Sequence, residues 1–200
     1  MLQLILASQS PRRRQLLEEA GYEFVVDTVK VSENIDENLN LEDALKVVAE
    51  SKAVALLNTG KFPKGQGFLV LSADTVVALD GQVLGKPKDF SEAERFLRLL
   101  SSRTHCVHTA ICLYDVDKGQ RVAAVETTRV TFRKLSREEI QDYLKSGEFM
   151  DKAGAYGIQG RGGDLVLSYD GSWSNVVGLP LELLRRILME QGWDVRSRSS

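Results

Sequence analysis

Apolar segments with the residue bias of strands alternate with helical segments along this chain, and that alternation limits the fold more than any other feature. Residues 2–7 form an apolar run typical of a buried strand, and Pro11, which favours a helix start, precedes periodic Leu16 and Leu17. Residues 41–57 place apolar side chains at helical spacing, which predicts a long amphipathic helix. The sequence therefore predicts an α/β protein.

Hairpin signals indicate that the sheet is not purely parallel. Asp80 and Gly81 separate two apolar runs, which is typical of a two-residue hairpin turn. Residues 104–114 and 122–132 have the residue bias of two long strands joined by a short polar connection, which indicates an antiparallel pair. We therefore expect a mixed, twisted sheet with helices on both faces.

The length and composition allow one enzyme-sized globular domain. The chain has 200 residues, of which 43% are hydrophobic, so it can bury a substantial core. We expect residues 1–194 to form a single domain and residues 195–200 to form a disordered tail. The 26 basic and 28 acidic side chains nearly cancel, which leaves no basic field for a nucleic acid backbone. An anionic ligand must therefore be bound by local features.

The apolar segments and the cysteines predict a cytoplasmic protein. No segment approaches the roughly 20 apolar residues that cross a bilayer, so we expect no membrane partner. The first apolar run precedes the charges at Arg12 and Arg13, whereas a signal peptide has its charges before the apolar segment. Cys106 and Cys112 are too few for a secreted disulfide framework, which favours a reducing compartment.

Two pairs of metal-binding residue types have plainer interpretations. No cluster with zinc-site spacing accompanies Cys106 and Cys112, and we interpret both as packing residues. His105 and His108 lie three residues apart in an expected strand, which places them on opposite faces. We therefore expect that the two histidines do not share one metal ion.

The strongest local signal for phosphate binding follows the first expected strand. Ser8, Arg12 and Arg13 lie where that strand meets a helix N-terminus, which offers hydroxyls, backbone amides and guanidinium groups. The alternative is an ordinary capped helix with a solvated basic first turn. Cations are disfavoured at a helix N-terminus, so consecutive arginines there favour the functional interpretation.

Two acidic residues are candidate metal ligands. Asp74 lies at an expected break between strand segments 68–71 and 76–79, where a metal or ligand would relieve the burial of its charge. A turn aspartate that bonds its own backbone explains the position equally well. Glu33 lies in a polar loop and is a second candidate ligand, although carboxylates are common in loops.

Two lysines and a glycine-dense loop are further candidates. Lys52 lies on the expected helix 41–57, and Lys86 lies in a tight turn next to a proline. Each lysine alone is also typical of a solvated surface. The glycines of residues 151–163 let the backbone approach a ligand closely, although a plain surface connection is the alternative. This loop lacks the Gly-Lys-Ser/Thr sequence of a P-loop.

Five short motifs occur in order along the chain. They are residues 4–13 (LILASQSPRR), 73–75 (ADT), 85–87 (GKP), 151–160 (DKAGAYGIQG) and 175–180 (NVVGLP). Together they resemble the Maf family of nucleotide pyrophosphatases over residues 4–184. One such motif is weak evidence, but five in this order are specific.

The resemblance implies a fold, a reaction and a site. The fold is a two-lobed α/β type related to inosine triphosphatase, with the nucleotide in a central cleft. The reaction is hydrolysis of a nucleoside triphosphate to the monophosphate and pyrophosphate with Mg²⁺ or Mn²⁺, and a homodimer is also implied. The residues that match are Asp74 as catalytic acceptor, Lys52 and Lys86 at the phosphates, Arg13 and Ser8 in the phosphate-binding loop, and Glu33 as a metal ligand with Asp74.

Three positions separate the branches of the family that this chain resembles. They are Arg12, Thr75 and Gln159 here, which is similar to the branch that acts on dTTP and UTP. The branch that acts on 7-methyl-GTP has Trp, Gln and Glu at these positions. An amide and a hydroxyl can pair with the donor and acceptor edge of thymine or uracil, whereas an indole and a carboxylate suit a cationic purine.

The expected mechanism is attack of water on the α-phosphorus. Asp74 would activate or position the water, with Glu33 and the metal organising the phosphate oxygens. Lys52, Lys86 and Arg13 would stabilise the charge on the departing pyrophosphate. The alternative is a nucleotide-binding regulator of septum formation that does not hydrolyse its ligand. RNA binding is disfavoured by the charge balance.

Overall fold

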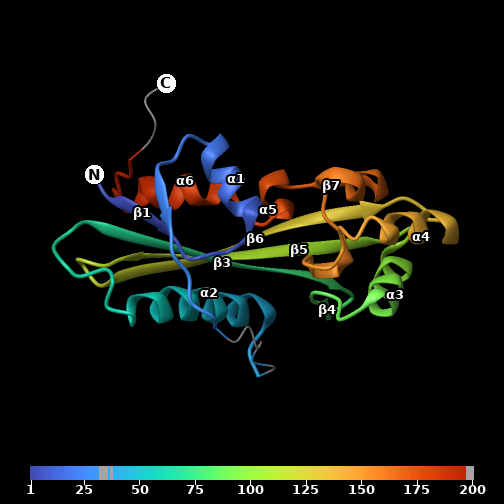
Figure 1. The fold of residues 1–200 in the computed structure, drawn as a ribbon, viewed down its shortest axis with the longest axis horizontal. Coiled ribbons are helices and arrows are strands. Elements are labelled where there is room, and N and C mark those ends of the chain that lie inside the picture. Colours follow the sequence, from blue (N-terminus) through green and yellow to red (C-terminus); the bar gives the residue numbers. More distant parts are fainter. Residues whose placement is uncertain (32–35, 37, 197–200) are drawn as a thin grey trace. The chain divides into compact units, whose positions relative to one another are not determined.

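The computed structural model describes residues 1–31, 36 and 38–196, and it confirms the prediction of a mixed α/β protein (Figure 1). Within these residues, seven strands form one sheet in the order β2-β1-β3-β5-β6-β7, with β4 paired to β3. The strands are β1 (Gln3–Leu6), β2 (Phe24–Val26), β3 (Phe68–Leu79), β4 (Gln82–Leu84), β5 (Thr104–Asp115), β6 (Gln120–Phe132) and β7 (Val166–Asp170).

Six α-helices and two short 3-10 helices lie in the same described residues. They are α1 (Pro11–Glu19), α2 (Leu41–Leu57), α3 (Phe90–Leu100), α4 (Arg137–Lys145), α5 (Trp173–Val177), α6 (Leu181–Glu190), η1 (Ala153–Ala155) and η2 (Gly160–Leu165). In the described part of the chain, no helix combines the length and the apolar character that crossing a bilayer requires.

The chain divides into two compact units. The first unit comprises the described residues of 1–74, 109–126 and 178–200, and the second comprises residues 75–108 and 127–177. Strands β3, β5 and β6 each contribute residues to both units. The single domain and the central cleft stay predictions.

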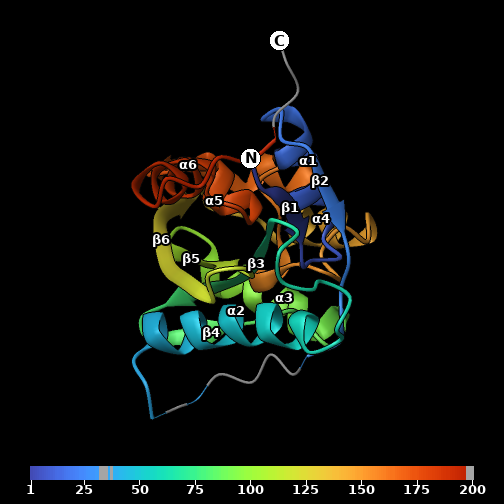
Figure 2. The same cartoon turned by 90° about the vertical axis from the view of Figure 1, so that its left-hand side faces the viewer.

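Parallel pairing builds the first unit around β1. Leu4, Ile5 and Leu6 pair in parallel with β2 on one side and with β3 on the other, and their side chains are buried. Helices α1 and α6 lie on one side of these strands, and α2 lies on the opposite side (Figures 1 and 2). A strand that is covered on both faces needs apolar residues at every position, which explains the continuous apolar run.

Helix α2 has the bounds that its apolar periodicity predicts. The side chain of Asn40 caps it by accepting a hydrogen bond from the backbone amide of Asp43 at 3.0 Å. The buried positions recur every three or four residues and are Ala44, Leu45, Val48, Ala49, Ala53 and Leu56. This apolar stripe fixes which side of α2 faces the sheet.

Strand β3 confirms one prediction and corrects another. It forms the predicted hairpin with β4, and Asp80 and Gly81 have φ values of 49° and 79°, as a hairpin turn of mirror-image type requires. The predicted break at residues 73–75 is wrong, because β3 runs without interruption from Phe68 to Leu79. Asp74 can lie inside a continuous strand because the ammonium group of Lys52 compensates its charge there.

Antiparallel pairing dominates the second unit. Hydrogen bonds join Thr104 to Thr131 and His108 to Thr127, so β5 and β6 run in opposite directions, as predicted. Strand β6 also pairs antiparallel with β7. A core of buried side chains comes from β3, β5, β6, α3, α4 and the 153–165 segment, and it includes Val77, Leu79, Phe96, Leu97, Val107, Phe132, Ile140, Leu144, Ala155, Tyr156 and Leu165.

The described end of the chain pairs with its beginning. Val195 forms a parallel bridge with Leu2, and the Arg196 amide donates to the Leu2 carbonyl at 3.2 Å. The Glu23 amide in turn donates to the Arg196 carbonyl at 3.1 Å. Residues 195 and 196 therefore have backbone partners, residues 197–200 lie outside the described residues, and the disordered tail stays a prediction.

Candidate active site

The loop between β1 and α1 has the geometry that its sequence predicts. The Ala7 amide donates to the Leu71 carbonyl at 2.8 Å and extends the β1–β3 pairing to the start of the loop. Ser8 is buried, and Ser10 caps α1 by accepting a hydrogen bond from the backbone amide of Arg13 at 3.4 Å. Helix N-termini favour anions, so the loop offers a place for phosphate.

Arg13 holds this loop against two other segments of the first unit. Its Nη1 atom donates to Ser8 Oγ and to the Ala73 carbonyl, both at 3.0 Å. Its Nε atom donates to the Gly178 carbonyl at 2.7 Å. Three acceptors around one planar guanidinium explain why an arginine lies in the first turn of a helix despite the unfavourable helix dipole.

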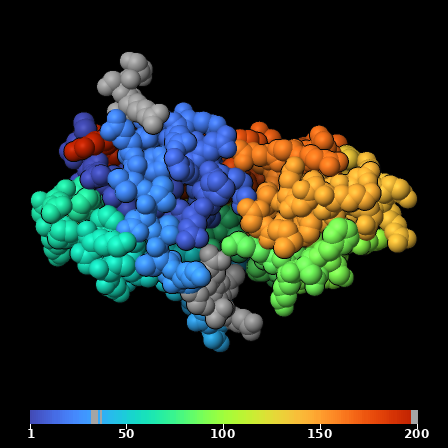
Figure 3. All heavy atoms as spheres, in the orientation of Figure 1, coloured from blue at the N-terminus to red at the C-terminus, as the bar shows by residue number. Residues whose placement is uncertain are grey.

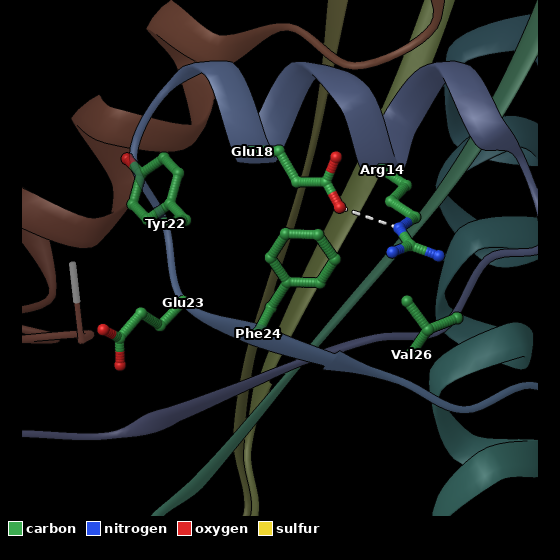
Figure 4. Close-up of a pocket in the computed structure, with 6 residues that line it drawn as sticks. All are labelled: Arg14, Glu18, Tyr22, Glu23, Phe24 and Val26. Atoms are coloured by element: carbon green, nitrogen blue, oxygen red, sulfur yellow. Dashed lines mark hydrogen bonds and ion pairs between the residues drawn. The ribbon is translucent and has the colours of Figure 1, made fainter. Parts of the chain in front are cut away.

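Arg14 has a different role from Arg13. Its Nε atom lies 2.8 Å from an Oε1 atom of Glu18 on the exposed side of α1. The N-terminal segment that includes α1 is seen at the surface in Figure 3, in blue. A pocket of about 470 Å³ lies there, lined by Arg14, Glu18, Tyr22, Glu23, Phe24 and Val26 (Figure 4). The predicted catalytic residues do not line this pocket.

Lys52 and Asp74 form an ion pair inside the first unit. Lys52 Nζ lies 2.6 Å from Asp74 Oδ1, and the two side chains are only 12% and 10% exposed. Helix α2 presents Lys52 to β3, and the Ser72 hydroxyl ties the same two elements by donating to the Ala49 carbonyl at 2.6 Å. The ammonium therefore compensates a carboxylate that burial would otherwise disfavour.

The Ala73 carbonyl links Arg13 of the N-terminal loop to the Lys52–Asp74 pair. It accepts from Arg13 Nη1 at 3.0 Å and from Lys52 Nζ at 3.3 Å. The structure therefore brings together Ser8, Arg13, Lys52 and Asp74, four of the residues that the sequence predicts. Sequence reasoning missed the Ala73 and Gly178 carbonyls, because a backbone acceptor leaves no signal in residue type.

The predicted metal ligands are only partly described. Glu33 lies outside the described residues, and no group of three or more His, Cys, Asp or Glu side chains elsewhere in the described chain could hold a metal ion. Asp74 contributes one carboxylate. Mg²⁺ commonly binds through one or two carboxylates together with substrate phosphates, so this donor set fits a metal that arrives with the nucleotide.

The second unit contains Thr75, Lys86 and Gln159. Thr75 and Gln159 are half-buried, and Lys86 is exposed. The amide of Gly154 donates to the carbonyl of Gly85 at 3.1 Å, which joins the glycine loop to the turn that contains Lys86. The contacts of these three side chains with a nucleotide stay predictions.

The two histidines have separate partners, as expected from their spacing. His105 Nε2 lies 2.7 Å from the hydroxyl of Tyr156, and His108 Nδ1 lies 2.8 Å from the hydroxyl of Thr127. His105 is almost fully buried and His108 is half-buried. That the two histidines do not share a metal ion stays a prediction.

The two cysteines are free thiols of β5. Cys106 is half-buried and Cys112 is fully buried. Burial, reinforced by the nearby carboxylate of Glu50, raises the pKa of the Cys112 thiol to about 12. A thiol that stays protonated at neutral pH is a poor nucleophile and metal ligand, which agrees with its interpretation as a packing residue.

Comparison with known proteins extends the local similarity to nearly the whole chain. The family model described as Maf-like protein matches residues 3–191. The chain is 50% identical over 185 residues to a dTTP/UTP pyrophosphatase of Bdellovibrio bacteriovorus, a match that covers 92% of this chain and 96% of that relative.

Two further relatives have the same described activity. A dTTP/UTP pyrophosphatase of Desulfitobacterium hafniense is 47% identical over 94% of this chain and 85% of its own length. One from Bacillus pumilus is 44% identical over 94% of this chain and 96% of its own length. The family match over residues 3–191 includes every segment that contributes to the contacts of Arg13, Lys52 and Asp74.

Proposed function

The chain belongs to the Maf-like protein family, and we propose that it hydrolyses nucleoside triphosphates, chiefly dTTP and UTP, to the monophosphate and pyrophosphate with a divalent metal ion. The single observation that carries this proposal is the Lys52–Asp74 ion pair beside the loop that Arg13 anchors. A charged acid group next to an anion-binding loop is what a phosphoanhydride hydrolase requires. The names of the relatives supply the substrate class.

Asp74 is the group that positions the attacking water in this proposal. Its Oδ1 atom is held by Lys52 at 2.6 Å, so its orientation is fixed before substrate binds. The carboxylate accepts a proton of the water as the oxygen approaches the α-phosphorus. Lys52 thus acts through Asp74, and we propose phosphate contact for Lys86.

The N-terminal loop binds the triphosphate in this proposal. The hydroxyl of Ser8 supplies a hydrogen-bond donor, the positive end of the α1 helix dipole favours an anion, and the guanidinium of Arg13 adds positive charge. Three contacts of Arg13 fix the loop in shape, so little ordering is needed when phosphate binds. Charge that develops on the departing pyrophosphate is stabilised in the same place.

Mg²⁺ or Mn²⁺ is the proposed cofactor. Asp74 is the proposed ligand among the described residues, and Glu33 is the second. When bound, such an ion neutralises phosphate oxygens and makes the phosphorus more electrophilic. Oxygen donors favour these two metals over zinc.

Arg12, Thr75 and Gln159 are the proposed base-selective residues. The amide of Gln159 can both donate and accept, and the hydroxyl of Thr75 can do the same. These groups suit the edge of thymine or uracil and supply neither the negative charge nor the indole face that a methylated purine favours. From the resemblance alone, we also propose a homodimer that acts in the cytoplasm.

The test is pyrophosphate release from dTTP, UTP, CTP, GTP and 7-methyl-GTP, with Mg²⁺, with Mn²⁺ and with a chelator. We expect metal-dependent release chiefly from dTTP and UTP. Preference for 7-methyl-GTP would overturn the base assignment alone. Tight binding of dTTP with no release under any condition would favour the nucleotide-binding regulator.

A further inference from the structure

Three aromatic rings pack edge to face in the core of the second unit. The centroids of His105 and Phe132 are 5.1 Å apart, those of His105 and Tyr156 are 5.4 Å apart, and those of Phe132 and Tyr156 are 4.7 Å apart. All three residues are at most 4% exposed. Each ring therefore fixes the position of the other two.

A hydrogen bond lies inside this apolar cluster. His105 Nε2 and the Tyr156 hydroxyl are 2.7 Å apart, while His105 Nδ1 is buried with no hydrogen-bond partner among the residues that the structure describes. Burial lowers the pKa of His105 to about 4, so the ring is neutral at neutral pH. An apolar residue would avoid an unsatisfied buried nitrogen, so stability alone does not account for a histidine at this position.

The chain is tightly packed on both sides of Tyr156. A Cβ atom added to Gly154 would lie 2.9 Å from Val77 Cγ2, and one added to Gly162 would lie 2.1 Å from the Gly157 carbonyl oxygen. The backbone just before Tyr156 therefore lies against Val77, and the loop from Gly157 to Gly162 closes tightly on itself. We expect a displacement of the Tyr156 ring to shift Gln159, which lies three residues further along the chain inside this loop.

We propose that His105 is a positioning residue for base selectivity: its hydrogen bond to Tyr156 fixes the segment that presents Gln159. The proposal rests on the proposed function, because Gln159 reads the base only if this chain binds a pyrimidine nucleotide. His105 touches neither substrate nor metal in this account. Its effect is on nucleotide affinity and base choice, and the hydrolytic step depends on the separate Lys52–Asp74 pair.

The first variant, Tyr156→Phe, removes the hydroxyl and keeps the ring. We expect the KM for dTTP to rise roughly three- to tenfold, the range of one hydrogen bond, with kcat changed by less than about twofold. The preference for dTTP over CTP, measured as the ratio of kcat/KM values, falls by a similar factor. We expect His105→Leu to raise the KM for dTTP and to lower the preference for dTTP over CTP by similar factors, with kcat nearly unchanged.

Two variants separate positioning from stability. His105→Gln keeps a polar atom near the place of Nε2, and we expect it to retain the wild-type KM and base preference. Tyr143→Phe removes another buried hydroxyl from the same core and leaves the His105–Tyr156 pair intact. We expect it to leave both quantities unchanged as well. A purely structural role would lower Tm in Tyr156→Phe and leave KM and base preference at wild-type values, which would overturn the proposal.

Hydrogen exchange at the amides of residues 157–163 provides a readout that does not need turnover. Faster exchange in Tyr156→Phe than in Tyr143→Phe supports the positioning role, even if wild-type protein hydrolyses neither dTTP nor UTP and the proposed function fails. Equal exchange in the two variants overturns the positioning role. If the wild-type enzyme hydrolyses dTTP and the Tyr156→Phe and His105→Leu variants keep its base preference, the positioning role of His105 is overturned and the proposed function is not.

Discussion

Lys52 and Asp74 lie 22 residues apart in the sequence, and an ammonium hydrogen of Lys52 meets a carboxylate oxygen of Asp74 at a donor–acceptor distance of 2.6 Å. Both side chains are nearly buried. Neither charge is well accommodated without the other, because removing one partner of a buried pair leaves the second without compensation. The pair therefore links the stability of the first unit to the position of its proposed catalytic carboxylate.

The first prediction concerns Lys52→Met, which keeps most of the length of the side chain and removes its charge. We expect a loss of about 3 kcal/mol in the free energy of unfolding, because the Asp74 carboxylate is left buried and unpaired. Urea unfolding measures this loss. Lys46→Met on the same helix removes an exposed partner of Asp43, and we expect it to change stability by less than about 1 kcal/mol. Equal losses in the two variants would contradict the prediction.

Asp74→Asn tests the carboxylate itself. The amide keeps the shape and a hydrogen-bond acceptor for Lys52 but cannot take a proton from water, so we expect turnover to fall about 10²- to 10⁴-fold. Circular dichroism should show an intact fold. The control is Asp80→Asn, since Asp80 is an exposed turn residue at the end of β3 and asparagine tolerates its positive φ. Near-normal turnover in Asp74→Asn would rule out the proposed role.

Adjacent arginines provide a third prediction. Arg13→Lys replaces a planar group that meets three acceptors with a single ammonium, and we expect KM for dTTP to rise about tenfold through loss of one to two hydrogen bonds. Arg14→Lys alters only an exposed pair with Glu18, so KM should stay within about twofold of wild type. Steady-state kinetics on the two variants compare neighbouring residues of the same type. A similar KM in both would show that the contacts of Arg13 do not organise the loop.

The pH dependence of stability contains a contribution from His105. Its folded pKa of about 4 lies below the unfolded value of about 6.5, so the unfolded chain binds the additional proton between these values. Stability is therefore lost as the pH falls through this window, by about 2 kcal/mol between pH 8 and pH 5. Urea unfolding of wild type and His105→Gln at both pH values measures the difference. An identical pH dependence in the two proteins would show that His105 is not buried in its neutral form.

Local chemistry accounts for the features that the sequence predicts well. The Ser136 hydroxyl caps α4 by accepting from the Glu139 amide, and the Glu139 carboxylate accepts from the Ser136 amide, a capping box that the Ser-x-x-Glu pattern of residues 136–139 indicates. The Asp80–Gly81 hairpin likewise depends on residues that are neighbours in the chain. The sequence singles out Arg13 because an arginine in a helix N-terminal turn violates a local preference, and the structure joins it to Ser8, while their contact with phosphate stays a prediction.

Long-range backbone contacts account for what the sequence did not predict. The sequence predicts a break between strand segments at Asp74 because a charged residue interrupts the apolar run, but Lys52 of a different element pairs with that charge inside a continuous strand. The carbonyl of Ala73 accepts hydrogen bonds from both Arg13 and Lys52, and a backbone acceptor cannot be predicted from the residue type. Helix α5 was also missed, because its five residues are too few for periodicity and Asn175 is fixed by a bond to the distant Val107 carbonyl at 3.0 Å.

Gly154 gives the last prediction, which tests the packing beneath the glycine loop. Its φ of 67° disfavours any side chain, and an added Cβ would lie 2.9 Å from Val77 Cγ2, so we expect Gly154→Ala to lose about 2 to 4 kcal/mol of stability. Gly85 is its hydrogen-bond partner but has open space around an added Cβ, so Gly85→Ala should lose less than about 1 kcal/mol. Thermal unfolding of both variants compares them directly. Because the two glycines share one hydrogen bond, equal stabilities would show that the loop can move away from Val77, and the rigid presentation of Gln159 would then fail as well.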